Sequence, residues 1–167
     1  MAPLPTPPPL RIGSGWDSHP FESGRPLWLG GLLLDHPEGL AGHSDGDVLL
    51  HAICDALLGA LALGDIGSHF PSSDRQWHGA ASSLFVRHAA QLVRHAGWNV
   101  VNLDATLILD RPRIGPLRSQ LRESVAGLLE LPSDRISIKA KTPEGLATPD
   151  TAIAQATVLL YQVSSGQ

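Results

Sequence analysis

The sequence has 167 residues, a length that suits one domain built around a single core. Apolar residues make up 43% of it and charged residues 17%, which excludes a wholly disordered chain. Twelve Lys and Arg against 16 Asp and Glu give a formal net charge of -4, so no overall basic field exists to attract nucleic acid or an anionic membrane. Any anionic ligand must be held by local cations, metal ions or backbone amides.

The first ten residues contain five prolines, which remove backbone donors and favour extended conformations. We expect residues 1–10 to be a mobile tail and residues 11–163 to form one domain. Neither a signal peptide nor an apolar run long enough to cross a membrane is recognisable. Cys54 has no second cysteine to pair with, which fits a reducing compartment. These features predict a cytoplasmic protein with no nucleic acid or membrane partner.

Two helices are predicted in the first half of the chain. The first covers residues 46–61, where leucine and isoleucine recur at helical spacing and Ser44 or Asp45 is placed to cap the start. The second runs from about Ser82 to Gly97, because glycine suits the left-handed position that ends many helices.

The second half alternates strands with one more helix. Residues 98–109, 136–141 and 152–162 alternate apolar and polar side chains, the pattern of half-buried strands; in the first of them, Val101 and Leu103 share the apolar face. A helix over residues 117–130 separates the first two strands, and it cannot continue through Pro132. This order predicts an α+β fold, a two-layer α/β sandwich whose mixed sheet carries the helices on one face. The other, half-polar face would meet water or another subunit.

One candidate metal site combines the first helix with an upstream segment. Asp47, His51 and Asp55 are spaced four residues apart and line up along one side of the helix. Asp17 and His19 would point to the same side of an extended chain. One carboxylate and two imidazoles, from Asp17, His19 and His51, match the ligand count of a catalytic zinc site with one open position. Asp47 or Asp55 would then orient His51. The alternative is an ordinary solvated helix face with an unrelated Asp and His pair.

Other motifs compete for the same loop. Residues 42–46 match G-x-S-x-G, the pattern of a nucleophilic serine at Ser44, although no buried strand precedes it as that motif requires. The amides opening the helix there would also suit a phosphate. A calcium loop is excluded, because Ala56 stands where such a loop needs glutamate. Late in the chain, Lys139, Lys141, Thr142 and Glu144 gather at a strand end, either as a functional cluster or as a solvated edge.

Taken in order, these motifs resemble one family. The sequence is similar to the 2-C-methyl-D-erythritol 2,4-cyclodiphosphate synthases over about residues 11 to 163. The motifs that carry this resemblance are RIGSGWDSH from Arg11, LGG from Leu29, HSDGDVLLHA from His43, DALLGA from Asp55, GDIG from Gly64, and Phe70 with Pro71.

The resemblance implies a metal-dependent phosphorus-oxygen lyase of isoprenoid biosynthesis. Such an enzyme converts 4-diphosphocytidyl-2-C-methyl-D-erythritol 2-phosphate into the cyclic diphosphate and CMP, as a homotrimer with its active site between subunits. By resemblance, Zn²⁺ or another divalent cation binds Asp17, His19 and His51, and Glu144 holds Mg²⁺ or Mn²⁺ with the substrate diphosphate. His43 and Thr142 would be catalytic. The substrate would contact Ser44, Asp65, Ile66, Gly67, Asp74, Leu109, Arg113 and Lys141, with residues 109–115 forming the cytidine pocket.

The sequence departs from the family pattern in two places. Ser72 stands where the family usually has aspartate, which leaves Asp74 for the sugar side of the substrate. The segment after Glu144 lacks the L-G-F-x-G pattern and the residues that line the trimer axis in many members. These changes keep a second interpretation open, a divergent relative that binds cytidine phosphates or a partner without turnover.

Overall fold

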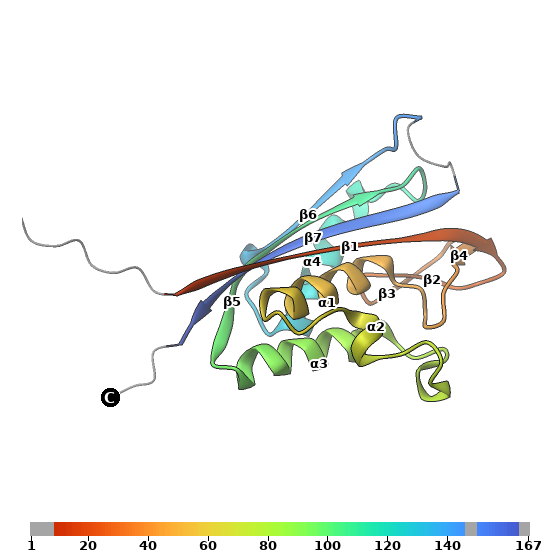
Figure 1. Cartoon of the computed structure of the whole chain (residues 1–167). Coiled ribbons are helices and arrows are strands. Elements are labelled where there is room, and N and C mark those ends of the chain that lie inside the picture. The colour runs from red at the N-terminus through yellow and green to blue at the C-terminus, as the bar shows by residue number, and fades with distance from the viewer. Residues whose placement is uncertain (1–8, 146–149, 164–167) are drawn as a thin grey trace, which may run out of the picture.

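The computed structural model describes residues 9–145 and 150–163. A five-stranded sheet in the order β4-β1-β7-β5-β6 forms one layer (Figure 1). Only the β5–β6 pair is parallel, so the sheet is mixed, as predicted. The bounds are β1 Leu10–Ser23, β4 Glu38–Leu40, β5 Trp98–Ile108, β6 Ile136–Lys141 and β7 Thr151–Gln162; β2 Leu27–Leu29 and β3 Leu32–Leu34 form a separate hairpin.

The helices form the second layer, on one face of the sheet (Figure 1). Their bounds are α1 Val48–Ala60, α2 Ile66–His69, α3 Ser82–His95 and α4 Arg118–Leu129, with 3-10 turns at Arg75–Trp77, Gly115–Leu117 and Ser133–Arg135. α1 is buried on nearly every side, because it lies between the sheet and α3. The two-layer α+β sandwich predicted from the sequence is therefore confirmed, and none of the described helices is long and apolar enough to span a membrane.

The predicted helices and late strands agree with the structure except in two details. The N-cap of α1 is Asp47, whose side chain accepts a hydrogen bond from the Leu50 amide; the prediction of Ser44 or Asp45 was wrong. Val101 does not share the buried face of β5 with Leu103 either. A β-bulge between Val100 and Asn102 shifts the alternation, so Val100 is buried and Val101 is only half-buried.

Strand β1 lies unusually close to α1, and glycine makes this possible. A Cβ atom at Gly13 would lie 1.9 Å from the carbonyl oxygen of Ala56, and one at Gly15 would lie 2.0 Å from that of Ala52. No side chain fits in that space, so the strand needs glycine at both positions. Asp17 and His19 have the same parity as these glycines, and the strand therefore delivers them to the helix side of the sheet.

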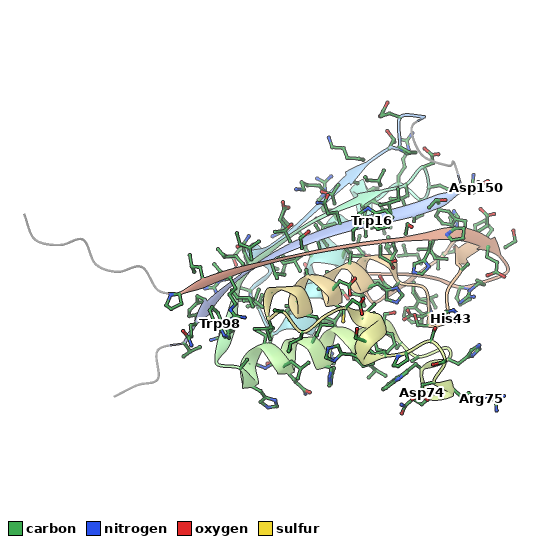
Figure 2. The ribbon with its side chains drawn as sticks, in the orientation of Figure 1. Trp16, His43, Asp74, Arg75, Trp98 and Asp150 are labelled. Atoms are coloured by element: carbon green, nitrogen blue, oxygen red, sulfur yellow. The ribbon has the colours of Figure 1, made fainter. Side chains whose placement is uncertain are left out.

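The opposite face of the sheet carries exposed apolar side chains on β1. Ile12 is 71% exposed and Trp16 is 58% exposed. Figure 2 shows Trp16 on the side of β1 that faces away from the helices. β1 pairs antiparallel with β7 from Leu10 opposite Tyr161 to Pro20 opposite Thr151, so the first and last strands are neighbours along most of their length. The expected tail was residues 1–10, but Leu10 already belongs to β1. Residues 1–8, 146–149 and 164–167 lie outside the described part of the chain.

Candidate metal centre and substrate cavities

Asp17, His19 and His51 form a compact cluster between β1 and α1. The Asp17 Oδ2 atom lies 2.8 Å from His19 Nε2 and 2.9 Å from His51 Nδ1, and the two nitrogens are 3.0 Å apart. In a tetrahedral site with bonds of about 2.0–2.1 Å, ligand atoms stand roughly 3.3 Å apart, a spacing this triangle reaches by expanding a few tenths of an ångström. One carboxylate and two imidazoles are donors that divalent zinc favours. The residues therefore fit a metal ion.

The electrostatics of Asp17 agree with this arrangement. Its partial burial would by itself raise the pKa of the carboxyl group, but hydrogen bonds and charge from His19 and His51 outweigh that effect. The net result is a pKa well below the usual range. Asp17 is thus ionised across the physiological range, as a metal ligand must be.

Asp47 and Asp55 do not orient His51, contrary to the expectation from their spacing. Asp47 is fully buried and accepts hydrogen bonds from the Gly30 amide at 2.9 Å and the Gly31 amide at 2.7 Å. Burial raises the pKa of Asp47, although these backbone amides act in the other direction. Asp55 accepts a bond of 2.7 Å from the Ile66 amide, and burial raises its pKa as well. Both carboxylates therefore fix backbone around the cluster.

Two serines contact His51 instead. Its Nε2 atom lies 2.9 Å from Ser44 Oγ and 2.8 Å from Ser82 Oγ. Ser82 is the first residue of α3 and is fully buried, and its hydroxyl donates to Asp45. Ser82 was not predicted from the sequence, because it stands 31 positions after His51 and nothing in its local pattern marks it.

A cavity of about 340 Å³ opens beside the cluster. It is lined by His43 and Ser44 from the loop before α1, by Ile66 and Gly67 of α2, and by His19 and His51; Gly42, Phe70, Pro71, Ser72, Ser73, Trp77 and Phe85 complete it. The structure thus brings six residues predicted from distant motifs to one cavity: His19, His43, Ser44, His51, Ile66 and Gly67. Its size suits a diphosphate and a small sugar.

Asp65 and Asp74, both predicted to contact substrate, do not line this cavity in the structure. Asp65 caps α2 by accepting from the Ser68 amide at 2.8 Å and the Ser68 hydroxyl at 2.6 Å, and these bonds lower its pKa. Asp74 caps the Arg75–Trp77 turn and bonds to Gln76. Figure 2 shows Asp74 and Arg75 projecting from the loop below His43.

A second cavity, of about 550 Å³, lies at the ends of β5 and β6. Leu109, Arg113, Lys141 and Thr142 line it together with Asp110, Pro112, Ile114, Gly115, Pro116 and Ala140. The predicted cytidine segment, 109–115, therefore meets two further predicted residues, Lys141 and Thr142. Thr142 donates a hydrogen bond to Glu144, whose backbone has a positive φ of 49°. The two cavities share no lining residue.

Comparisons with known proteins agree with one another. The model of the YgbB family matches residues 10–161. The chain is 54% identical over 151 residues to the 2-C-methyl-D-erythritol 2,4-cyclodiphosphate synthase of Koribacter versatilis, covering 90% of this chain and 97% of that protein. It is also 58% identical over 138 residues to a bifunctional enzyme IspD/IspF of Erythrobacter litoralis, covering 83% of this chain. The chain spans only 36% of that longer relative.

Solved structures give the same result. A 2C-methyl-D-erythritol-2,4-cyclodiphosphate synthase in a CDP-bound form superposes with a TM-score of 0.85 at 50% identity, covering 90% of this chain and 99% of that one. A CDP complex of IspF from Plasmodium falciparum superposes with a TM-score of 0.82 at 30% identity, covering 95% of this chain and 100% of that one. Sequence and fold therefore point to the same relatives.

Proposed function

The chain belongs to the YgbB family, the family of the 2-C-methyl-D-erythritol 2,4-cyclodiphosphate synthases, and we propose how it carries out their reaction. It converts 4-diphosphocytidyl-2-C-methyl-D-erythritol 2-phosphate into 2-C-methyl-D-erythritol 2,4-cyclodiphosphate and CMP, a step of non-mevalonate isoprenoid biosynthesis. The observation that carries this proposal is the cluster of Asp17, His19 and His51 at the wall of a cavity sized for a diphosphate.

The reaction needs no nucleophile from the protein. A 2-phosphate oxygen of the substrate attacks its own β-phosphorus, and the bond from that phosphorus to the oxygen bridging the α- and β-phosphates breaks. CMP leaves with the bridging oxygen and its electron pair. The protein must fold the substrate so that the attacking oxygen is in line, and it must stabilise negative charge on the β-phosphate and the leaving group.

The metal ligands have a defined task in this scheme. Asp17, His19 and His51 hold Zn²⁺, which supplies Lewis-acid stabilisation of charge on the β-phosphate when it is bound. Glu144 holds Mg²⁺ or Mn²⁺ together with the substrate diphosphate, a hard oxygen ligand for a hard cation. The hydrogen bond from Thr142 orients the Glu144 carboxylate.

The remaining predicted residues bind the substrate around the reacting phosphates. His43 and Ser44 line the metal cavity and donate to the diphosphate, with His43 stabilising the transition state. Ile66 and Gly67 contact the erythritol part in the same cavity. Asp65 and Asp74, which cap α2 and the Arg75–Trp77 turn in this structure, bind the sugar side of the substrate. Arg113 and Lys141 are cations of the second cavity, where Leu109 packs against the cytosine and Thr142 approaches the phosphates.

We propose that the working enzyme is a homotrimer in the cytoplasm, with each active site shared between two subunits. The metal cavity and the cytidine cavity share no lining residue, which supports a site in which a neighbouring subunit brings its cytidine cavity to the metal cavity. The exposed apolar residues Ile12 and Trp16 on the free face of the sheet support a subunit contact there. The unpaired Cys54 supports the reducing compartment.

A serine hydrolase is the second candidate, because one set of distances favours it. Ser44 Oγ lies 2.9 Å from His51 Nε2, and His51 Nδ1 lies 2.9 Å from Asp17 Oδ2, the order of contacts in a Ser-His-Asp triad. Two features favour the synthase instead. His19 shares the same Asp17 oxygen, which converts the triad into a three-ligand cluster. The strand before Ser44 is β4, which has only three residues and lies at the edge of the sheet, unlike the strand that presents a nucleophilic serine in a hydrolase.

Phosphorus NMR of the purified protein with the diphosphocytidyl substrate tests the proposal. Formation of the cyclic diphosphate and CMP in equal amounts is the expected result. Binding without CMP release would favour the divergent, non-catalytic relative. Covalent labelling of Ser44 by a fluorophosphonate, without turnover of the substrate, would favour the hydrolase.

A further inference from the structure

A chain of hydrogen bonds links the metal cluster to the rest of the fold, from His51 through Ser82 to Asp45. All three residues come from different segments: α1, the first turn of α3, and the loop before α1. Ser82 is fully buried and does not line the metal cavity, so substrate cannot reach it. Ser44 differs from Ser82 in this respect, because it contacts the same nitrogen but lines the cavity.

The donor and acceptor roles in this link follow from Asp45. An ionised carboxylate only accepts hydrogen bonds, and Asp45 accepts from the Ser82 hydroxyl and, at 2.9 Å, from the Ser82 amide. The single proton of the Ser82 hydroxyl is therefore used, and its oxygen can only accept on the side of His51. At 2.8 Å it accepts the Nε2 proton of that ring.

That assignment determines which nitrogen of His51 binds a metal. With the proton on Nε2, the free lone pair is on Nδ1, the atom that lies beside Asp17 and His19. We propose that Ser82, held by Asp45, is a positioning residue that fixes the His51 tautomer and ring orientation for metal binding through Nδ1. The proposal rests on the function proposed above, since it concerns the metal of that site.

The same link ties the cluster to α3. Asp45 caps the first turn of α3, where the residue at the N-cap position, Ala81, has no side chain to do so, and a carboxylate is favoured at the positive end of a helix. The backbone of the Asp45 loop also pairs with this region, through the Asp45 amide to the Ala80 carbonyl at 3.1 Å. A rigid anchor of this kind lets a single buried hydroxyl set the orientation of a ligand ring.

Competition with a chromophoric zinc chelator tests the proposal on the full chain. Partners that hold a ligand ring typically contribute 10–100-fold in metal affinity, so we expect Ser82→Ala to bind zinc weaker by about that factor. The zinc affinity of Asp45→Asn should lie between those of Ser82→Ala and the wild type. The oxygen of the new side-chain amide can still accept from Ser82, but the amide can also turn its NH₂ group toward the Ser82 hydroxyl. Ser44→Ala should stay within about threefold of the wild type, since Ser82 alone can accept the Nε2 proton.

A control with the same chemical change is available at Ser124, whose hydroxyl donates to the Gly30 carbonyl at 2.6 Å. Ser124→Ala should keep the zinc affinity of the wild type. The melting temperatures of all variants, measured without metal, separate a lost ligand orientation from a general loss of stability. Equal zinc affinity of Ser82→Ala and the wild type would overturn the proposal, and so would a Ser44→Ala loss as large as that of Ser82→Ala.

If Ser82→Ala does not fold, an NMR spectrum of the wild type tests the His51 tautomer directly. Long-range ¹H–¹⁵N correlation of the zinc-loaded protein should show His51 protonated at Nε2, with that proton protected from exchange with water. Zinc on Nε2 and a proton on Nδ1 would overturn the proposal. A wild type that binds no zinc would instead count against the proposed function, so the two failures are distinguishable.

Discussion

Gly15 lies against the backbone of Ala52, so close that a Cβ atom on Gly15 would stand 2.0 Å from the Ala52 carbonyl oxygen. Ala52 follows His51 directly, and Asp17 lies two residues after Gly15. The contact therefore sets the distance between the strand that carries two metal ligands and the helix that carries the third. Backbone atoms cannot yield as the far end of a flexible side chain can, which makes this distance a fixed property of the fold.

Gly15→Ala should weaken both the fold and the metal site. Forcing a methyl group into this contact costs about 1–3 kcal/mol or more through backbone displacement, and the same displacement moves Asp17 away from His51. Thermal unfolding and zinc titration measure the two effects. Gly127→Ala is the control: this exposed α4 position has nothing within 4 Å of a new Cβ, and alanine there should keep or raise the melting temperature. A Gly15→Ala protein with wild-type stability and zinc affinity would contradict the argument.

His51→Ala should abolish the stoichiometric binding of zinc while the fold persists. The variant removes one of three protein ligands, and the other two lie on a strand that is held by β7 along its length. Metal analysis after dialysis, together with circular dichroism, measures occupancy and fold. His95→Ala changes an exposed histidine at the end of α3 and should retain the metal. Undiminished zinc in His51→Ala would refute the ligand assignment.

Asp47→Ala should be among the most destabilising single changes in the described chain. It removes the N-cap of α1 and leaves the Gly30 and Gly31 amides without their acceptor. A lost cap costs about 1 kcal/mol and an unsatisfied buried donor about 1–3 kcal/mol, so a total of roughly 3 kcal/mol or more is expected. Urea unfolding measures it, with the exposed Asp134→Ala as a reference close to the wild type. A loss below about 1 kcal/mol would show that water replaces the carboxylate easily.

Mixing two impaired variants should restore activity if subunits share active sites. His51→Ala damages the metal cavity and Arg113→Ala the cytidine cavity. In trimers formed at random from equal amounts, about a quarter of the shared sites would combine two intact halves. CMP release by the mixture, compared with each variant alone, is the measurement. Absence of recovery, with subunit exchange confirmed by native mass spectrometry, would place both cavities of one site in the same subunit.

Cys54 should be inert to thiol reagents in the folded protein. Burial in α1 raises the pKa of its thiol to about 12, so the reactive thiolate is essentially absent at pH 8. Iodoacetamide should label the protein only after unfolding in urea, as followed by intact mass. Labelling of the native protein at a rate close to that of the unfolded chain would mean that α1 opens readily.

The sequence predicted helices and strands correctly where apolar residues recur with a clear period. The alternation along β7 and the helical spacing of Leu50, Ile53 and Leu57 predicted buried faces that the structure has. Strand β1 was not predicted as a strand of 14 residues, because its buried positions include Gly13 and Gly15, which have no side chain to signal burial. The two glycines allow the close approach of α1, and this contact can be seen only in the folded structure.

Some residues of the candidate site could be predicted from the sequence and others could not. Asp17 and His19 stand two residues apart, but His51 follows 32 residues later, so the residue types alone left an ordinary helix face as an alternative. The family resemblance made the three residues a set. Asp45 was assigned to the wrong helix, since sequence distance favours α1 while its carboxylate bonds to α3, 37 residues away. Ser82 gave no signal at all: a serine at a helix start is common, and its role depends on two partners that the fold brings to it.

The pairing of β1 with β7 has a consequence for joining this domain to other proteins. Leu10 lies opposite Tyr161, so both ends of the sheet domain leave the molecule side by side, near Trp98 and away from His43 (Figure 2). Asp17 stands seven positions after Leu10 on an extended strand, a distance of roughly 23 Å at about 3.3 Å per residue. A fused domain or affinity tag at either end would thus stand clear of the metal centre. A short linker between the two ends, with new termini opened in a surface loop, would give a circularly permuted chain.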